Sequence, residues 1–245
     1  MTIGIHYLTN DPEWFPSVEL ALSDPPGLLA IGGDLSPKRL YSAYQHGIFP
    51  WFNHDEPILW WSPDPRAVLK PSAIRCNKSL RKFLRKSNYR ISVNSGFDRV
   101  IQACAEPRGD REGTWILPQM QKSYSLLHHQ NKAHSIEVWQ EENLVGGLYG
   151  VLVGSCFCGE SMFSRLPNAS KLALLTLGHI MAQDEHSLID CQLPNAYLSS
   201  MGATLQSRDV FLHNLRKASQ RIMPKASFSP KFIEWQSALN LNDNG

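Results

Sequence analysis

The feature that most constrains the fold is an uncharged run between Glu142 and Glu160. Its seventeen residues include glycines at positions 146, 147, 150, 154 and 159, and they are otherwise rich in Leu, Val, Tyr, Phe and Cys. This composition is typical of buried strands. Glycines weaken strands, so several together indicate the close approach of another backbone or of a ligand. The plainest interpretation is a buried hairpin with glycines at its turns.

Length, composition and net charge limit the kinds of protein to which this run can belong. A chain of 245 residues fits one large domain or two unequal ones, and a hydrophobic share of 42% supplies a core. The net charge of +2 gives no global attraction to nucleic acid or membrane, so any nucleic-acid site must be a local patch. Five scattered cysteines are typical of reduced thiols rather than of a disulfide framework. The N-terminus lacks a signal-peptide pattern and the uncharged run is slightly short for a bilayer, so we expect a soluble, cytoplasmic protein without a membrane partner.

The first 62 residues predict a small separate domain. Prolines and aromatic residues punctuate this part and leave room only for short elements. One helix is expected, with Ser36 as its N-cap, Pro37 as its first residue and Gly47 ending it. The remaining residues, 63–245, predict a larger domain whose tail is loosely held after about residue 224.

A basic segment follows at residues 75–90. Its positive side chains recur at helical spacing with Leu80, Phe83 and Leu84 on the other side, and no acidic residue interrupts it. A basic run is usually just a solvated helix face. In a nearly neutral chain, however, an unbalanced cluster favours a contact with a phosphate backbone. The candidate residues are Lys78, Arg81, Lys82, Arg85 and Lys86.

Strands and helices alternate through the rest of the chain, which predicts an α+β fold. Helices are expected over about 96–104, 118–129, 168–182 and 207–215, with Asn168 and Ser207 as N-caps. Strands are expected over 134–140, twice within the uncharged run, and over 187–191.

Two strands end in carboxylates. Asp190 lies at the end of a buried strand, where catalytic groups are common in mixed α/β layers, and Gln192 would point to the same side if the strand continues. Such a pair could orient an attacking amine or steer its proton. Glu160 ends the other apolar strand, and two acids in one apolar cleft would bind a cationic substrate. The alternatives are a helix-capping Asp190 with a surface Gln192, and a Glu160 that pairs with Arg165 or Lys171.

Several kinds of chemistry lack their motifs. The spacing of Cys156 and Cys158 lacks the two-residue gap usual for zinc, and no second pair follows, so we expect no metal. Phosphate-binding loops, dinucleotide fingerprints and nucleophile elbows are missing from the sequence, and we expect no cofactor.

Long ordered segments resemble a known family, the bacterial leucyl/phenylalanyl-tRNA–protein transferases. The resemblance covers about residues 15 to 215. It is carried by GLLAIGGDLSPKRL (27–40), AYQHGIFPWF (43–52), PILWWSPDPRAVL (57–69), GTWI (113–116), AHSIEVW (133–139), LVGGLYGV (144–151), FCGESMFSR (157–165), NASK (168–171) and LIDCQ (188–192).

The resemblance implies a function and a fold. Such an enzyme moves leucine or phenylalanine from aminoacyl-tRNA onto the α-amine of a protein that begins with Arg or Lys, which creates a degradation signal of the N-end rule pathway. The implied fold is a small N-terminal domain followed by a GNAT-like, acyltransferase-like domain. Ester aminolysis of this kind needs no cofactor, since positioning can supply much of the acceleration.

The resemblance also implies residue roles. Asp190 and Gln192 would act on the attacking amine, with Glu160 in the supporting network. In one mechanism the Gln192 carbonyl takes up the amine proton with Asp190 behind it, and in another Asp190 mainly orients; the sequence leaves both open. The basic helix would grip the tRNA acceptor stem. The terminal adenosine would meet Trp51, Trp115 and Tyr124, and the pocket for the transferred side chain would comprise Leu148, Phe157, Leu174, Leu177 and Ile189.

The sequence departs from the family pattern at three places. Leu148 stands where Met is frequent, Leu177 where Phe is frequent, and Tyr197 where His is frequent, so the balance between leucine and phenylalanine stays open. Two other functions compete with the transferase: an acyl-CoA N-acyltransferase of the same fold, and a non-catalytic tRNA-binding protein. The first lacks its glycine-rich pyrophosphate turn, because Asn168 and Ser170 occupy that stretch. The second is supported only by the basic helix.

Overall fold

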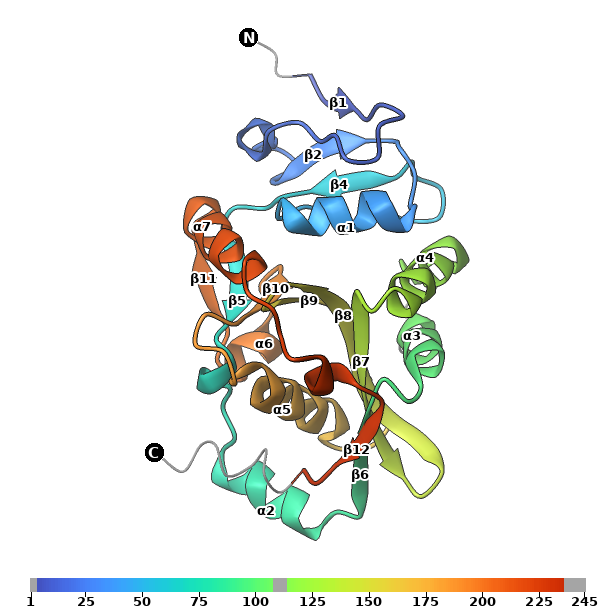
Figure 1. Cartoon of the computed structure of the whole chain (residues 1–245), viewed down its shortest axis with the longest axis vertical. Coiled ribbons are helices and arrows are strands. Elements are labelled where there is room, and N and C mark those ends of the chain that lie inside the picture. Colours follow the sequence, from blue (N-terminus) through green and yellow to red (C-terminus); the bar gives the residue numbers. More distant parts are fainter. Residues whose placement is uncertain (1–3, 108–113, 236–245) are drawn as a thin grey trace.

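The computed structural model describes residues 4–107 and 114–235, which form two sheets (Figure 1). A four-stranded sheet in the order β1-β2-β4-β3 belongs entirely to the first 61 residues, and an eight-stranded sheet in the order β11-β5-β10-β9-β8-β7-β6-β12 takes up the rest. The small sheet consists of β1 (His6–Tyr7), β2 (Leu28–Ile31), β3 (Phe49–Pro50) and β4 (Leu59–Trp61), with a 3-10 turn, η1, at Val18–Leu20.

Helix α1 (Pro37–Gln45) packs between the small sheet and the larger one. Its start and end are as predicted: the Ser36 side chain accepts a hydrogen bond from the backbone of Arg39, and Gly47 adopts a positive φ of 74° just after the helix. In Figure 1 the helix lies beneath the small sheet and faces the large one. Its buried Leu40 and Tyr44 belong to a hydrophobic cluster that extends into the larger part of the molecule.

The large sheet is antiparallel except for one parallel pair, β9 with β10. The predicted hairpin of the uncharged run forms its centre as β8 and β9. The eight strands are β5 (Arg66–Leu69), β6 (Tyr89–Val93), β7 (Ala133–Gln140), β8 (Asn143–Val153), β9 (Cys156–Ser164), β10 (Leu188–Gln192), β11 (Thr204–Gln206) and β12 (Lys231–Ile233).

Helices cover both faces of this sheet. One face meets α5 (Ala169–Met181) and the apolar side of the basic helix α2 (Lys78–Lys86), while the other meets α3 (Phe97–Ala105), α4 (Pro118–His129), α7 (Arg208–Ser219) and α1. Residues alternate between the faces, so neighbours such as Leu148 and Tyr149 enter different hydrophobic clusters. The short elements are α6 (Ala196–Ser200), η2 (Pro71–Ala73) and η3 (Lys225–Phe228).

The glycines of the hairpin serve close packing more than turns. Only Gly154 lies at the turn, with a φ of 61°. A Cβ on Gly146 would come within 2.4 Å of the Ala169 side chain, and one on Gly150 within 2.5 Å of the Phe157 ring. Gly159 differs, because the nearest atom to an added Cβ is the Asp190 carbonyl oxygen at 3.5 Å. The interpretation of the glycines as turn residues is therefore wrong for all but Gly154.

The tail packs against the large sheet beyond residue 224. Beyond residue 224, η3 buries Phe228, β12 pairs antiparallel with β6, and the Trp235 indole donates a hydrogen bond to the Tyr89 carbonyl at 2.9 Å. These contacts up to residue 235 were not foreseen, because an edge strand and two aromatic anchors give little periodic signal, and the loosely held tail stays a prediction. Residues 236–245 lie outside the described part.

Three local predictions also need correction. Asn168 precedes α5 in a left-handed conformation, with a φ of 63°, and its side chain does not cap the helix. The helix expected to end at Leu215 continues to Ser219. Phe83 is 37% exposed, whereas Leu80 and Leu84 are buried as expected.

The mixed α and β class is confirmed, while the GNAT-like assignment and the two-domain division at residue 62 stay predictions. Within residues 4–107 and 114–235, the helices are too short or too polar to cross a membrane.

Candidate active site

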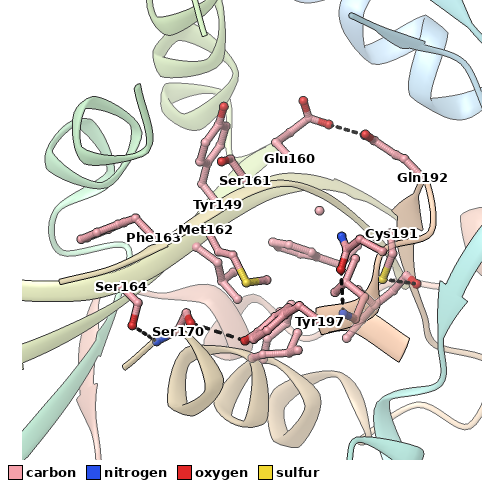
Figure 2. A pocket seen from close by; sticks show the side chains of 18 of the residues that line it. Tyr149, Glu160, Ser161, Met162, Phe163, Ser164, Ser170, Cys191, Gln192 and Tyr197 are labelled. Carbon is pink, nitrogen blue, oxygen red and sulfur yellow. Dashed lines mark hydrogen bonds between the residues drawn. The ribbon is translucent and has the colours of Figure 1, made fainter. Parts of the chain in front are cut away.

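A cavity of about 810 Å³ opens where β9 and β10 part (Figure 2). The two strands pair in parallel only as far as Asp190 opposite Cys158. Beyond that point β9 continues to Ser164, whereas β10 loses its register with β5 between Asp190 and Gln192. The strands therefore separate at their carboxyl ends, where mixed α/β sheets commonly hold ligands.

One wall of the cavity is apolar. It contains all five residues that the family resemblance assigns to a side-chain pocket, and each of them is buried. They come from three strands and one helix: Leu148 on β8, Phe157 on β9, Ile189 on β10, and Leu174 and Leu177 on α5. A buried apolar wall of this kind suits an aliphatic or aromatic group.

Asp190 forms a buried ion pair with Arg66. The guanidinium donates two hydrogen bonds to the carboxylate, at 2.8 and 2.7 Å, and both side chains are 1% exposed. The Arg66 guanidinium lies over the rings of Phe49 and Phe211, at 4.8 and 4.7 Å from their centroids. Burial disfavours the charged guanidinium, but the Asp190 charge and its hydrogen bonds more than offset this and raise the pKa of Arg66.

Gln192 is held in a bulge at the end of β10. Its φ is 62°, and its backbone N–H donates to the Asp190 carboxylate at 2.9 Å. Its side-chain Nε2 donates to Glu160 at 2.8 Å, the contact drawn between these two labelled residues in Figure 2. The strand does not continue regularly, so the reason for placing Asp190 and Gln192 on one side was wrong. Both residues line the cavity nonetheless.

Glu160 ends a chain of hydroxyl groups that begins in the small N-terminal part. The Tyr124 hydroxyl donates to Glu160 at 2.7 Å and lies 2.5 Å from the Tyr44 hydroxyl of α1. Because Tyr124 gives its proton to Glu160, its oxygen accepts the proton of Tyr44. Burial and the Glu160 charge raise the pKa of both tyrosines, so both remain donors.

The environment of Glu160 keeps it close to titration at neutral pH. Burial raises the pKa of Glu160 to about 7, and hydrogen bonds from Tyr124, Tyr44 and Gln192 oppose part of that rise. The alternative in which Glu160 pairs with Arg165 is wrong, since Arg165 forms its ion pair with Glu106 at 2.5 Å.

The two carboxylates meet at the cavity as expected, although Glu160 lies inside β9 and not at its end, because the strand continues through Ser164. The two carboxylates are not equivalent. Asp190 is neutralised by Arg66, whereas the hydrogen bonds to Glu160 come from uncharged side chains. The expectation that both acids are free to bind a cationic substrate therefore fails for Asp190.

The three residues expected around an adenosine differ in exposure and in their surroundings. Trp51 is 43% exposed and its ring tilts against Trp61, 5.6 Å between centroids. Trp115 is half-buried just before α4, and Tyr124 is buried beneath Glu160. Neither tryptophan lines the cavity.

The basic helix forms as predicted, and none of its residues lines the cavity. In Figure 1 it occupies the end of the molecule opposite the small sheet. Asn77 caps it, and its apolar side, Leu80 and Leu84, is buried in the hydrophobic cluster that also contains residues of α5 and the large sheet. Of its basic side chains, Arg81 is half-buried, and the exposed ones are Lys78, Lys82, Arg85 and Lys86.

Sequence reasoning missed Arg66 and Tyr44. Each contacts the site across a long separation: Arg66 precedes Asp190 by 124 residues, and Tyr44 precedes Tyr124 by 80. Arg66 lies inside one of the motifs shared with the family, but nothing local marks it as buried. Only paired variation in related sequences could have signalled these contacts.

Within the described ranges, the His, Cys, Asp and Glu side chains form no group of three or more that could hold a metal ion.

Comparisons with known proteins agree with the resemblance. The family model described as "Leucyl/phenylalanyl-tRNA protein transferase" matches residues 68–216, and the model of that family's N-terminal domain matches residues 33–64. Proteins named leucyl/phenylalanyl-tRNA–protein transferase match from Shewanella woodyi, at 53% identity over 87% of this chain and 91% of the relative, and from Shewanella baltica, at 51% over 94% and 97%.

Among solved structures, L-PGS from Bacillus licheniformis aligns with 84% of this chain and 64% of its own at 12% identity, with a TM-score of 0.35, which is too low to carry an argument. The family model by itself spans more than half of the 245 residues, and the relatives match along nearly their whole length. The chain therefore belongs to the leucyl/phenylalanyl-tRNA protein transferase family of aminoacyltransferases.

Proposed function

We propose that this protein transfers leucine or phenylalanine from aminoacyl-tRNA to the α-amine of proteins that begin with Arg or Lys, marking them for N-end rule degradation in the cytoplasm. The observation that carries the proposal is one cavity with an apolar wall on one side and Gln192, Glu160 and Asp190 on the other. The wall accepts the side chain of the aminoacyl group, and the polar side faces its ester. The GNAT-like character of the larger domain, and the division at residue 62, belong to the same proposal.

The reaction is an ester aminolysis. The neutral α-amine attacks the ester carbonyl carbon, the C–N bond forms, and the bond from that carbon to the ribose oxygen breaks. The amine loses one proton and the ribose oxygen gains one, so no metal or redox partner is needed. Holding the amine against the carbonyl can supply much of the acceleration in such a step.

Gln192 receives the amine in this mechanism. Its Nε2 is committed to Glu160, so its carbonyl oxygen is the end available to an incoming N–H. A hydrogen bond from the amine to that oxygen points the nitrogen lone pair at the ester. Glu160 fixes the orientation of the amide, and Tyr124 and Tyr44 fix Glu160.

Asp190 is a positioning residue. Both of its carboxylate oxygens are engaged by Arg66, and one of them also accepts the backbone N–H of Gln192. These contacts favour the orienting role over a direct part in proton transfer, because the carboxylate is turned toward Arg66. Asp190 holds the bulge that presents Gln192.

The tRNA is expected to extend away from the cavity. The exposed Trp51 and the half-buried Trp115 offer stacking surfaces for the terminal adenosine, with Tyr124 as the third expected neighbour. The exposed basic side of α2 offers phosphate contacts to the acceptor stem.

The decisive experiment supplies labelled leucyl-tRNA and a peptide that begins with Arg. We expect label to enter the peptide, and we expect no label from acyl-CoA. The Asp190→Ala variant is expected to lose transfer while its folded fraction retains tRNA binding, because the substitution removes the support of Gln192. It also leaves Arg66 buried without its carboxylate, so folding of the variant is checked first by circular dichroism. No transfer by the natural chain, or transfer from acyl-CoA, rejects the proposal.

The role of α2 has its own test. Reversing the charges of Lys82 and Arg85 is expected to weaken tRNA binding and to reduce the salt slope by about one for each phosphate that the helix no longer neutralises. Reversing Arg216 and Lys217, an exposed basic pair in the last turn of α7, is the matched control. Equal effects of the two double variants would remove α2 from the tRNA interface.

A further inference from the structure

The back of the apolar wall is formed by the tail of the chain. Phe157 lines the cavity, and its ring also stacks on Phe228 of η3, with centroids 6.1 Å apart and planes 12° from parallel. Phe228 stacks in turn on His134 of β7, 4.4 Å between centroids. Phe228 is buried but does not line the cavity, so it supports the wall from behind.

A set of polar contacts fixes Phe228 in place. The Asn94 side-chain amide donates to the Phe228 carbonyl at 2.5 Å and lies 2.9 Å from His134 Nδ1. The side-chain oxygen of Asn94, Oδ1, accepts a hydrogen bond from the backbone N–H of Ser135 at 2.9 Å. Burial lowers the pKa of His134 to about 4, so the imidazole is neutral near pH 7 and its Nδ1 can accept a hydrogen bond.

The Phe157 ring has little freedom to move on its other side. It lies against Gly150 so closely that an added Cβ there would fall 2.5 Å from a ring carbon. The ring is thus confined between the sheet backbone, Phe228 and the cavity. Of these, only the side chain of Phe228 can be shortened without changing the sheet or the lining of the cavity.

We infer that Phe228, from the tail segment 225–235, is a specificity-determining residue that sets the depth of the side-chain pocket and so the balance between leucine and phenylalanine. The inference rests on the proposed function, in which this cavity holds the transferred side chain. A full-sized ring at position 228 holds Phe157 forward and keeps the pocket shallow. A smaller side chain lets Phe157 retreat, which deepens the pocket and favours the larger substrate.

The test compares kcat/KM for phenylalanyl-tRNA and leucyl-tRNA in Phe228→Ala. Apolar pockets discriminate by roughly 10-fold or more for a change of one methylene, so we expect the phenylalanine-to-leucine ratio to rise about tenfold. The ratio is insensitive to the fraction of active protein, so a general loss of stability leaves it unchanged. Phe232→Ala is the matched control, because Phe232 is 58% exposed on β12 of the same tail and its ring faces Arg90 instead of the cavity. We expect it to keep the natural ratio.

Phe228→Leu keeps the inference testable if the alanine variant does not fold, and its ratio is expected to shift in the same direction by a smaller factor. A natural protein that transfers neither amino acid rejects the proposed function itself. A natural protein that transfers both, with an unchanged ratio or a shift toward leucine in the Phe228 variants, overturns only the role of Phe228.

Discussion

Two buried carboxylates on neighbouring strands, Asp190 of β10 and Glu160 of β9, show how differently a fold can accommodate a charge. Asp190 has a cation of its own, since Arg66 donates two hydrogen bonds to it and both side chains are almost fully buried. Glu160 accepts its hydrogen bonds from Tyr124 and Gln192, which carry no charge.

The difference divides the site into a fixed half and a titratable half. A buried ion pair is stable as long as both partners remain, and losing one leaves the other charged and unsolvated. A buried carboxyl without a cation instead binds a proton more readily, which is why the pKa of Glu160 rises to about 7. Asp190 and Arg66 thus keep the position of Gln192 fixed, whereas the charge of Glu160 can change with pH.

The largest effect is expected from removing the cation of the fixed half. Arg66→Met leaves Asp190 buried and unpaired, which should lower the free energy of unfolding by about 3–5 kcal/mol. Denaturant unfolding measures this loss. Replacing both residues, as Arg66→Met with Asp190→Leu, should recover part of it, because no charge then remains buried.

Arg39→Met is the matched control for this prediction. Arg39 is as buried as Arg66, but its partner Asp34 is 53% exposed and stays hydrated when the arginine is removed. We expect a smaller loss than for Arg66→Met. Equal losses in the two variants would mean that packing, and not the unpaired Asp190, dominates.

The second prediction concerns the titratable half. The folded-state pKa of Glu160, about 7, lies above the ordinary 4.5, so its stabilising contribution is full below pH 4.5 and is lost as pH rises to about 7. The loss is on the order of 3 kcal/mol, from about 1.4 kcal/mol per pKa unit. Glu160→Gln cannot titrate, so its stability relative to the natural protein should rise between pH 5 and pH 8, as measured by unfolding at both values.

Transfer activity should also depend on the protonation of Glu160, but it should increase with pH over the range in which stability decreases. Ionised Glu160 accepts from Gln192 Nε2, whereas a protonated carboxyl can donate to the Gln192 carbonyl and occupy the oxygen that the amine needs. We therefore expect activity to rise with pH through about 7. In Glu160→Gln, losing a charged hydrogen bond should reduce transfer at pH 8 by roughly ten- to a hundredfold. If the variant kept the same rising limb as the natural protein with the same peptide, Glu160 would not be the titrating group.

The smallest effect is expected at the far end of the hydroxyl chain. Tyr44→Phe removes one buried hydrogen bond, to Tyr124, and should lower stability by about 1 kcal/mol. It should also move the midpoint of the pH–activity profile to higher pH, because hydrogen bonding by the Tyr44 hydroxyl helps to lower the pKa of Glu160. The exposed Tyr7, substituted in the same way, is the control, and an unmoved midpoint in Tyr44→Phe would separate α1 from the chemistry.

Local signals were sufficient for the longer helices and for strands β7 to β10, but not for the short strands of either sheet. Ser36 and Ser207 cap helices as predicted, and the uncharged run forms the central hairpin. These features depend on neighbours in sequence, whose chemistry is legible without a structure. Local signals failed for Asn168, which is not a cap, and for the tail, whose anchors Phe228 and Trp235 are isolated aromatic residues.

The candidate site was predictable in part for the same reason. Asp190, Gln192 and Glu160 follow apolar stretches of the sequence, which pointed to one cleft, although Glu160 lies inside β9 and not at its end. The bulge that turns Gln192 toward Glu160 was not predictable, because it depends on how β10 pairs with β5 and β9.

The sequence alone therefore determined the mixed fold class, the hairpin, the basic helix and, through its motifs, the family. Only the tertiary structure decided which carboxylate is neutralised, that Tyr44 reaches the site, and that Phe228 backs the pocket. Those outcomes rest on contacts between residues tens to more than a hundred positions apart. Such contacts depend on how the whole chain packs, and the residues next to each one in sequence do not predict them.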